Sequence, residues 1–155
     1  MTWSERVVWR DGTHLSRRDR GGPGRPVVLP HELAGHAGEW DLVAERLAAR
    51  HRVVAVDQRG HGASERRPED RSRAAYVADV LAVLDSLDLR EPVLVGQSMG
   101  GNAALSTAAA HPARAHAPVP VEALTEGTRR AAVPGASPGP GTGRQGRVAG
   151  ARRFR

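Results

Sequence analysis

Gly96, Ser98 and Gly100 form a Gly-x-Ser-x-Gly pentapeptide whose residue types and spacing suit nucleophilic chemistry. It follows the short apolar run 92–95 and precedes an alanine-rich segment, so it predicts an abrupt turn from a buried strand into a helix over 99–110. Glycines on both sides of the serine remove Cβ atoms that would collide in such a turn. We expect the Ser98 hydroxyl to be exposed at the positive end of the new helix, where an oxyanion is stabilised. The alternative is a serine in an ordinary strand–helix loop.

The elements that position this turn follow from the hydrophobic pattern. A hairpin is predicted for residues 6–9 and 14–18, because Asp11-Gly12 between them is a turn signal. Buried strands are predicted at 27–29, 52–56 and 92–95, and helices at 39–50, 74–87 and 99–110. Strands that alternate with helices predict an α/β fold with a mostly parallel sheet flanked by helices. The apolar face of the helix at 74–87 is expected to comprise Tyr76, Val77, Val80, Leu81, Leu84 and Leu87.

The regular alternation of predicted strands and helices ends at residue 110. Residues 117–121 read Ala-Pro-Val-Pro-Val where a further strand is expected, and two prolines predict that this strand is damaged or absent. Residues 123–155 are rich in Arg, Gly and Pro and have few large apolar side chains, so we expect a disordered tail. The predicted organisation is a domain over 1–122, with its motifs in 27–122, followed by that tail.

Residues 27–122 resemble the first half of the α/β-hydrolase family, in its lipase, esterase and haloperoxidase-like branch. Three motifs carry the resemblance: the loop 31–35 (His-Glu-Leu-Ala-Gly), the loop 57–64 (Asp-Gln-Arg-Gly-His-Gly-Ala-Ser) and the turn 96–101. The resemblance implies that Ser98 is the nucleophile and that the backbone N–H groups of Leu33 and Met99 form the oxyanion hole. It implies a hydrolase of esters or related small acyl compounds. Asp57 and His61 are expected to hold their loop, since the family's triad runs Ser, acid, His along the chain.

Three departures from the family's pattern predict weak or no activity. Glu32 replaces a glycine beside the predicted oxyanion hole, the next strand contains the two prolines, and no histidine follows His116. Glu122 is the candidate acid, but a serine without its base is a poor nucleophile. We therefore expect a truncated hydrolase, with a frameshift near 123–126 as the simplest origin of the tail. The alternatives are a non-catalytic remnant or scaffold and, less favoured, a protein that binds through its basic tail.

The amino-acid composition bears on metal sites, disulfides, membrane segments and nucleic-acid binding. The 155 residues include no cysteine, which rules out disulfides and thiolate metal sites, and we expect neither cofactor nor metal. No apolar run approaches a membrane span or a secretory signal, so a cytoplasmic protein is expected. The net charge is +6, but all 17 acidic residues precede residue 127, so the excess of arginine belongs to the tail. We expect a small-molecule substrate and no nucleic-acid or membrane partner. The abundance of residues with GC-rich codons indicates a high-GC bacterium.

Overall fold

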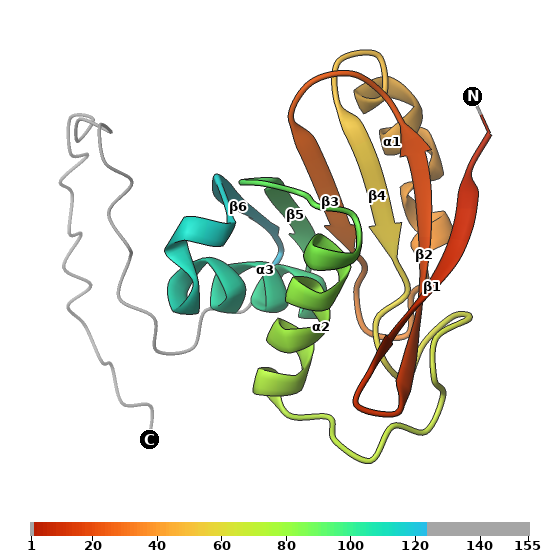
Figure 1. The fold of residues 1–155 in the computed structure, drawn as a ribbon, viewed down its shortest axis with the longest axis vertical. Helices are drawn as coiled ribbons and strands as arrows, with labels where there is room; N and C mark the ends of the chain where they lie inside the picture. Colours follow the sequence, from red (N-terminus) through yellow and green to blue (C-terminus); the bar gives the residue numbers. More distant parts are fainter. Residues whose placement is uncertain (1, 124–155) are drawn as a thin grey trace, which may run out of the picture. The chain divides into compact units, whose positions relative to one another are not determined.

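The computed structural model describes residues 2–123, which form one twisted sheet covered by helices (Figure 1). The predicted tail over 123–155 therefore lies, apart from its first residue, outside the described residues. The six strands lie in the order β1-β2-β4-β3-β5-β6. Their bounds are β1 Ser4–Arg10, β2 Thr13–Gly21, β3 Pro26–Pro30, β4 Arg52–Val56, β5 Val93–Gln97 and β6 Ala117–Val121; the helices are η1 Ala37–Trp40, α1 Asp41–Leu47, α2 Arg73–Ser86, α3 Met99–Ala110 and η2 Pro112–Arg114.

The sheet is mostly parallel, as the alternation of strands and helices predicts. β4, β3, β5 and β6 pair in parallel, whereas β1 and β2 form an antiparallel hairpin whose second strand pairs antiparallel with β4. The hairpin turns at Asp11 and Gly12, with φ angles of 48° and 74°. Two consecutive positive φ values are what an Asp-Gly turn between twisted strands requires.

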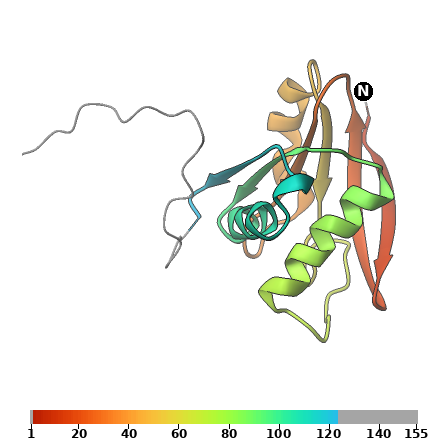
Figure 2. The same cartoon turned by 60° about the vertical axis from the view of Figure 1, so that its left-hand side comes forward.

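Helices cover both faces of the sheet (Figures 1 and 2). α1 lies on one face, where Trp40, Ala44 and Ala48 pack against apolar side chains of β3 and β4. α2 and α3 lie on the other face, where Val83, Leu84 and Ala104 belong to a second apolar cluster with the sheet. Burial on both faces explains why the central strands are nearly continuous runs of valine, leucine and alanine.

β6 corrects the expectation of a damaged or absent strand at 117–121. It pairs with β5 at five positions, with Pro118 opposite Leu94 and Pro120 opposite Gly96. The carbonyl of Val121 accepts the N–H of Ser98, so the backbone of the odd-numbered residues faces β5. Because backbone groups alternate along a strand, the missing N–H groups of the two prolines face away from β5. Prolines are tolerated in such an edge position, and β6 is the last strand in the described part of the sheet.

Two predicted helices differ in detail from the observed ones. The helix expected over 39–50 is a 3-10 turn, η1, followed by the shorter α1. The His36 side chain caps η1 by accepting the N–H of Gly38. On α2, Leu81 and Leu87 are only half-buried, whereas Asp79 and Val83 are buried. The face of α2 that is buried therefore differs from the apolar face predicted from the sequence, because it includes the charged residue Asp79. None of the helices within residues 2–123 has the length and apolar character needed to cross a membrane.

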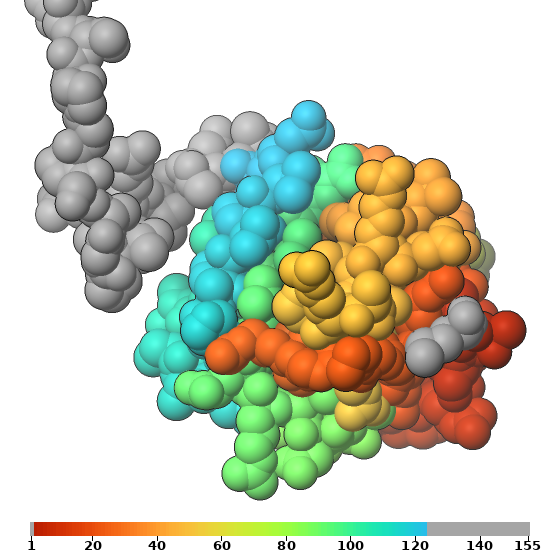
Figure 3. Space-filling model, turned by 90° about the horizontal axis from the view of Figure 1, so that it is seen from above, coloured from red at the N-terminus to blue at the C-terminus, as the bar shows by residue number. Residues whose placement is uncertain are grey.

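The two ends of the parallel strands carry different loops. At the amino ends, seen from above in Figure 3, the segment before β3, the loop before β5 and the start of β6 lie side by side. Arg25 donates to the carbonyl of Glu91 there, at 3.2 Å, and His116 donates its N–H to Pro92, at 2.9 Å. The carboxyl ends lead into the three loops that carry the sequence motifs. Open parallel sheets bind their ligands at this end.

Candidate functional site

Ser98 occupies the junction between β5 and α3, in a strained backbone conformation. Its φ and ψ are 47° and −108°, which L side chains rarely adopt. A Cβ on Gly96 would lie 2.2 Å from the carbonyl oxygen of Gly100, and a Cβ on Gly100 would lie 2.2 Å from that of Pro30. Both glycines of the pentapeptide are therefore required by close backbone approach, and the structure shows the abrupt turn that the sequence predicts.

The backbone around Ser98 is held firmly, while its hydroxyl is not used to cap the helix. The N–H of Ser98 donates to Val121 at 2.8 Å, and its carbonyl accepts the N–H of Asn102 at 3.0 Å. The side chain of Ser98 makes no capping hydrogen bond. Met99 is the first residue of α3, so its N–H belongs to the helix-terminal groups that have no partner within the helix. This arrangement leaves a half-buried hydroxyl beside backbone donors.

The loop after β3 reaches the turn at residues 96–100, which we call the elbow, through the close approach of Gly100 to Pro30 and His31. Leu33, whose N–H is the other predicted oxyanion donor, is exposed, with 67% of its surface accessible. Ala34 follows with φ of 66°, and the N–H of Gly35 donates to Glu32 at 3.2 Å, so the segment is a tight turn. Glu32 directly precedes Leu33 in the chain. Within residues 2–123, the carboxylate of Glu32 has no ion-pair partner.

His31 is a structural residue of this loop. Its side chain is fully buried, and its Nε2 accepts the N–H of Gln58 at 3.0 Å. Its Nδ1 lies 2.6 Å from the carbonyl oxygen of Glu32 and donates to it. Burial lowers the pKa of His31 below its usual value, which agrees with a neutral ring that has one donor and one acceptor. Gln58 also donates its side-chain amide to the carbonyl of His31 at 2.5 Å, so the loops after β3 and β4 are tied together.

Asp57 and His61 hold the loop after β4, as the sequence predicts. The carboxylate of Asp57 is buried and accepts the N–H groups of Ala37, at 2.6 Å, and Ala63, at 2.9 Å. His61 places its Nδ1 3.0 Å from the carbonyl oxygen of Arg59, and its ring packs edge-on against His31 at 5.2 Å between centroids. A carboxylate that two backbone donors occupy is a scaffold for loops and not a free general base.

An ion pair that the sequence motifs do not reveal lies beneath these loops. Arg59 exposes 2% of its side chain and makes two hydrogen bonds of 2.5 Å to the carboxylate of Asp79, which also accepts from Arg10 at 2.9 Å. The hydrogen bonds to Asp79 raise the pKa of Arg59. Asp79 lies among the apolar residues of α2, and this was the available signal, because an isolated carboxylate on a buried helix face needs a partner.

No histidine side chain forms a hydrogen bond with Ser98 in the described part of the chain. The chain has seven, and all lie in the described part. His116, the last, starts β6 beside Pro92, whereas Ser98 follows the end of β5, which puts them roughly 20 Å apart at about 3.3 Å per residue. Glu122 is nearer, since it follows Val121 directly, and it is exposed with φ of 51°. Among residues 2–123, no group of His, Asp and Glu side chains is arranged to hold a metal ion.

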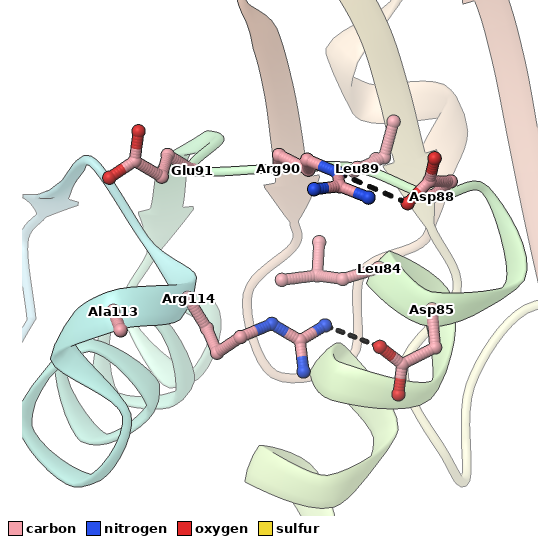
Figure 4. Close-up of a pocket in the computed structure, with 8 residues that line it drawn as sticks. All are labelled: Leu84, Asp85, Asp88, Leu89, Arg90, Glu91, Ala113 and Arg114. Carbon is pink, nitrogen blue, oxygen red and sulfur yellow. Dashed lines mark hydrogen bonds and ion pairs between the residues drawn. The ribbon is translucent and has the colours of Figure 1, made fainter.

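One cavity formed by the described residues lies away from Ser98. It has a volume of about 480 Å³ and opens at the amino end of β5, between the end of α2 and η2. Figure 4 shows that each of its two arginines pairs with an aspartate, Arg114 with Asp85 and Arg90 with Asp88. Its arginines are therefore neutralised by adjacent carboxylates.

Comparisons with known proteins agree on one family. A family model described as alpha/beta hydrolase fold matches residues 25–142. The non-heme chloroperoxidase of Streptomyces lividans is 38% identical over 121 residues, 76% of this chain and 44% of that protein. The non-heme haloperoxidase of Rhodococcus erythropolis is 38% identical over 106 residues, 68% of this chain and 38% of that protein. A structure of Est816, an N-acyl homoserine lactone degrading enzyme, aligns with a TM-score of 0.68 and 33% identity over 71% of this chain and 42% of its own. The chain thus spans less than half the length of these relatives.

Proposed function

Because the chain belongs to the α/β-hydrolase family, we propose that it is a serine hydrolase by descent, with Ser98 as nucleophile and at most weak activity. One observation supports this most strongly. Ser98 keeps an unfavourable φ of 47° between two glycines that have no room for a Cβ. Strain of this kind persists where the surrounding structure enforces it, and it is typical of reactive sites.

In the proposed reaction, the Ser98 Oγ attacks the carbonyl carbon of an ester and its proton passes to solvent. The N–H groups of Met99 and Leu33 donate to the resulting oxyanion. Collapse of this intermediate releases the alcohol and leaves an acyl group on Ser98, which water then removes as a carboxylic acid. The substrate class is an ester or related small acyl compound. The lactone-degrading neighbour supports this class, because a lactone is a cyclic ester.

Weak activity follows from the surroundings of Ser98. A complete Ser-His-Asp triad supplies about 10⁶-fold in rate in a serine protease. Here His31 is neutral and fully engaged, and His116 is remote. Glu32 adds an unpaired negative charge beside the donor of Leu33, which disfavours an oxyanion. The competing proposal, a non-catalytic remnant or scaffold, differs in predicting no dependence on Ser98.

The test is hydrolysis of 4-nitrophenyl acetate by the full-length chain. We expect slow turnover that Ser98→Ala abolishes and that Ser4→Ala, at an exposed position in β1, leaves unchanged. Equal rates for the wild type and Ser98→Ala would refute the nucleophile and favour the remnant. Fast turnover that depends on Ser98 would support the nucleophile but refute weak activity, since it would require a base that we have not assigned.

A further inference from the structure

A smaller cavity lies one helical turn from the elbow, between the start of α2 and the start of α3. Its volume is about 130 Å³, and its polar lining consists of Arg71, Arg73 and Tyr76 on one side with Asn102 and Ser106 on the other. Met99 also lines it and is the residue that follows Ser98. The cavity therefore borders the first residue of α3, directly after Ser98.

The charge of this cavity is positive and uncompensated. Within residues 2–123, neither Arg71 nor Arg73 forms an ion pair, and no carboxylate lines the cavity. Arg71 makes one long hydrogen bond, of 3.3 Å, to the carbonyl of Arg66. In the larger cavity, by contrast, Arg114 and Arg90 are each paired with an aspartate (Figure 4). Two unpaired guanidinium groups at one cavity favour an anion, and their planar donors match a carboxylate.

Neutral donors complete the lining. The phenol of Tyr76 is half-buried, and burial raises its pKa, so it remains a hydroxyl at any pH at which a carboxylate ligand is ionised. Asn102 and Ser106 present an amide and a hydroxyl from successive turns of α3. Hydrogen bonds from such groups add direction to the attraction of the two arginines.

The size of the cavity limits what part of a ligand it can hold. Its volume of about 130 Å³ is a few times the roughly 30 Å³ that a water molecule occupies in the liquid. It is well below the roughly 300 Å³ of the smaller whole-ligand pockets. A carboxylate and the carbon atoms next to it fit these limits, with the rest of the molecule directed toward Met99 and Ser98.

We propose that this cavity binds the carboxylate of an anionic acyl substrate whose ester bond lies at Ser98, an assignment that rests on the proposed function. The reaction would then favour esters with a carboxylate about one helical turn, roughly 5 Å, from the bond that breaks. An ester formed on the 4-hydroxyl group of 4-hydroxybenzoate keeps its carboxylate free and has about this reach.

Binding is tested first, without any need for turnover. We would titrate 4-hydroxybenzoate and its methyl ester into the full-length chain by calorimetry. The carboxylate should bind, and the neutral methyl ester should bind at least about tenfold more weakly, since a hydrogen bond to a charged group is worth that much. The double variant Arg71→Gln/Arg73→Gln should abolish this preference, and Arg90→Gln, at the larger cavity, should retain it. A preference that survives the double variant, or no preference in the wild type, would overturn the proposal.

Hydrolysis separates this proposal from the proposed function. We expect kcat/KM for 4-acetoxybenzoate to exceed that for methyl 4-acetoxybenzoate at least about tenfold, to fall to parity in the double variant, and to be largely retained in Arg71→Lys/Arg73→Lys. Ser98-dependent hydrolysis without this preference would overturn the anion site and leave the nucleophile in place. Carboxylate binding that depends on both arginines, together with hydrolysis that is independent of Ser98, would retain the anion site and overturn the proposed function.

Discussion

α2 places two aspartates beside arginines in very different surroundings, Asp79 in the middle of the helix and Asp85 near its end. Near the loops at the carboxyl ends of the strands, Asp79 and Arg59 are buried, with exposed side-chain fractions of 6% and 2%. At the amino end, Asp85 and Arg114 form an ion pair across the mouth of the larger cavity, with exposed fractions of 65% and 38% (Figure 4). The first pair is enclosed by apolar packing, whereas water surrounds the second.

This difference shows which polar groups organise the molecule. Buried pairs cannot lose one member without leaving an uncompensated charge, whereas exposed pairs exchange protein contacts for water at little cost. The loops that approach Ser98 are attached to the buried kind, through Arg59, Asp57 and His31. The larger cavity lies at the amino ends of the parallel strands, but the buried polar groups that hold loops in place lie at the carboxyl ends of those strands.

The largest expected effect comes from breaking the buried pair. Asp79→Ala should lower the free energy of unfolding by about 3–5 kcal/mol, because Arg59 would remain buried without its partner. Asp85→Ala, on the same helix, should lower it by no more than about 1 kcal/mol. Urea unfolding of the full-length chain measures both. Similar losses for the two variants would remove the distinction between the buried and the exposed ion pair.

A smaller effect on stability is expected from adding a side chain at Gly100, where the elbow packs closely against the backbone of Pro30. Gly100→Ala would place a Cβ 2.2 Å from the backbone oxygen of Pro30, so backbone must move, at a cost of about 1–3 kcal/mol. Gly35→Ala is the matched control, because the atoms nearest to its Cβ belong to the carboxylate of Glu39, a flexible side chain that can move away. The control should lose less stability in the same urea measurement. A Gly100→Ala variant as stable as the wild type would show that the elbow is not tightly packed against β3.

The smallest effect concerns pH. Burial holds the pKa of His31 below its unfolded value, so the unfolded chain takes up the proton first as the pH falls. His31 should therefore cost stability as the pH drops through the unfolded pKa of about 6.5, until the folded pKa is reached. The difference in unfolding free energy between pH 7.5 and 5 should be smaller in His31→Gln than in the wild type. His116→Gln, exposed at the amino end, should leave that difference in place. An unchanged difference in His31→Gln would mean that the ring is not held neutral.

Much of the carboxyl-end architecture could be predicted from the sequence, because local rules determine it. The glycines around Ser98 and the Asp-Gly turn specify backbone conformations that few other residues allow. The alternation of strands and helices similarly determines the parallel sheet. These features depend on neighbours in the chain, and the structure confirms them.

What the sequence could not supply depends on partners distant in the chain. β6 forms despite Pro118 and Pro120 because their missing donors face away from β5, a consequence of edge position and register. The partner of Asp79 could not be identified as Arg59 from spacing, since the two are joined only by folding. The same holds for Gln58 and His31, which connect two loops through a side chain and a backbone group.

The most direct test of the central claim is whether Ser98 is chemically activated. The full-length chain would be incubated with a fluorophosphonate, which phosphonylates nucleophilic serines, and the modified peptide located by mass spectrometry. We predict slow labelling confined to Ser98, lost in Ser98→Ala and retained in Ser4→Ala, whose serine is exposed in β1. Labelling spread over other serines at the same rate, or none at Ser98 in a chain that unfolds cooperatively, would contradict the account.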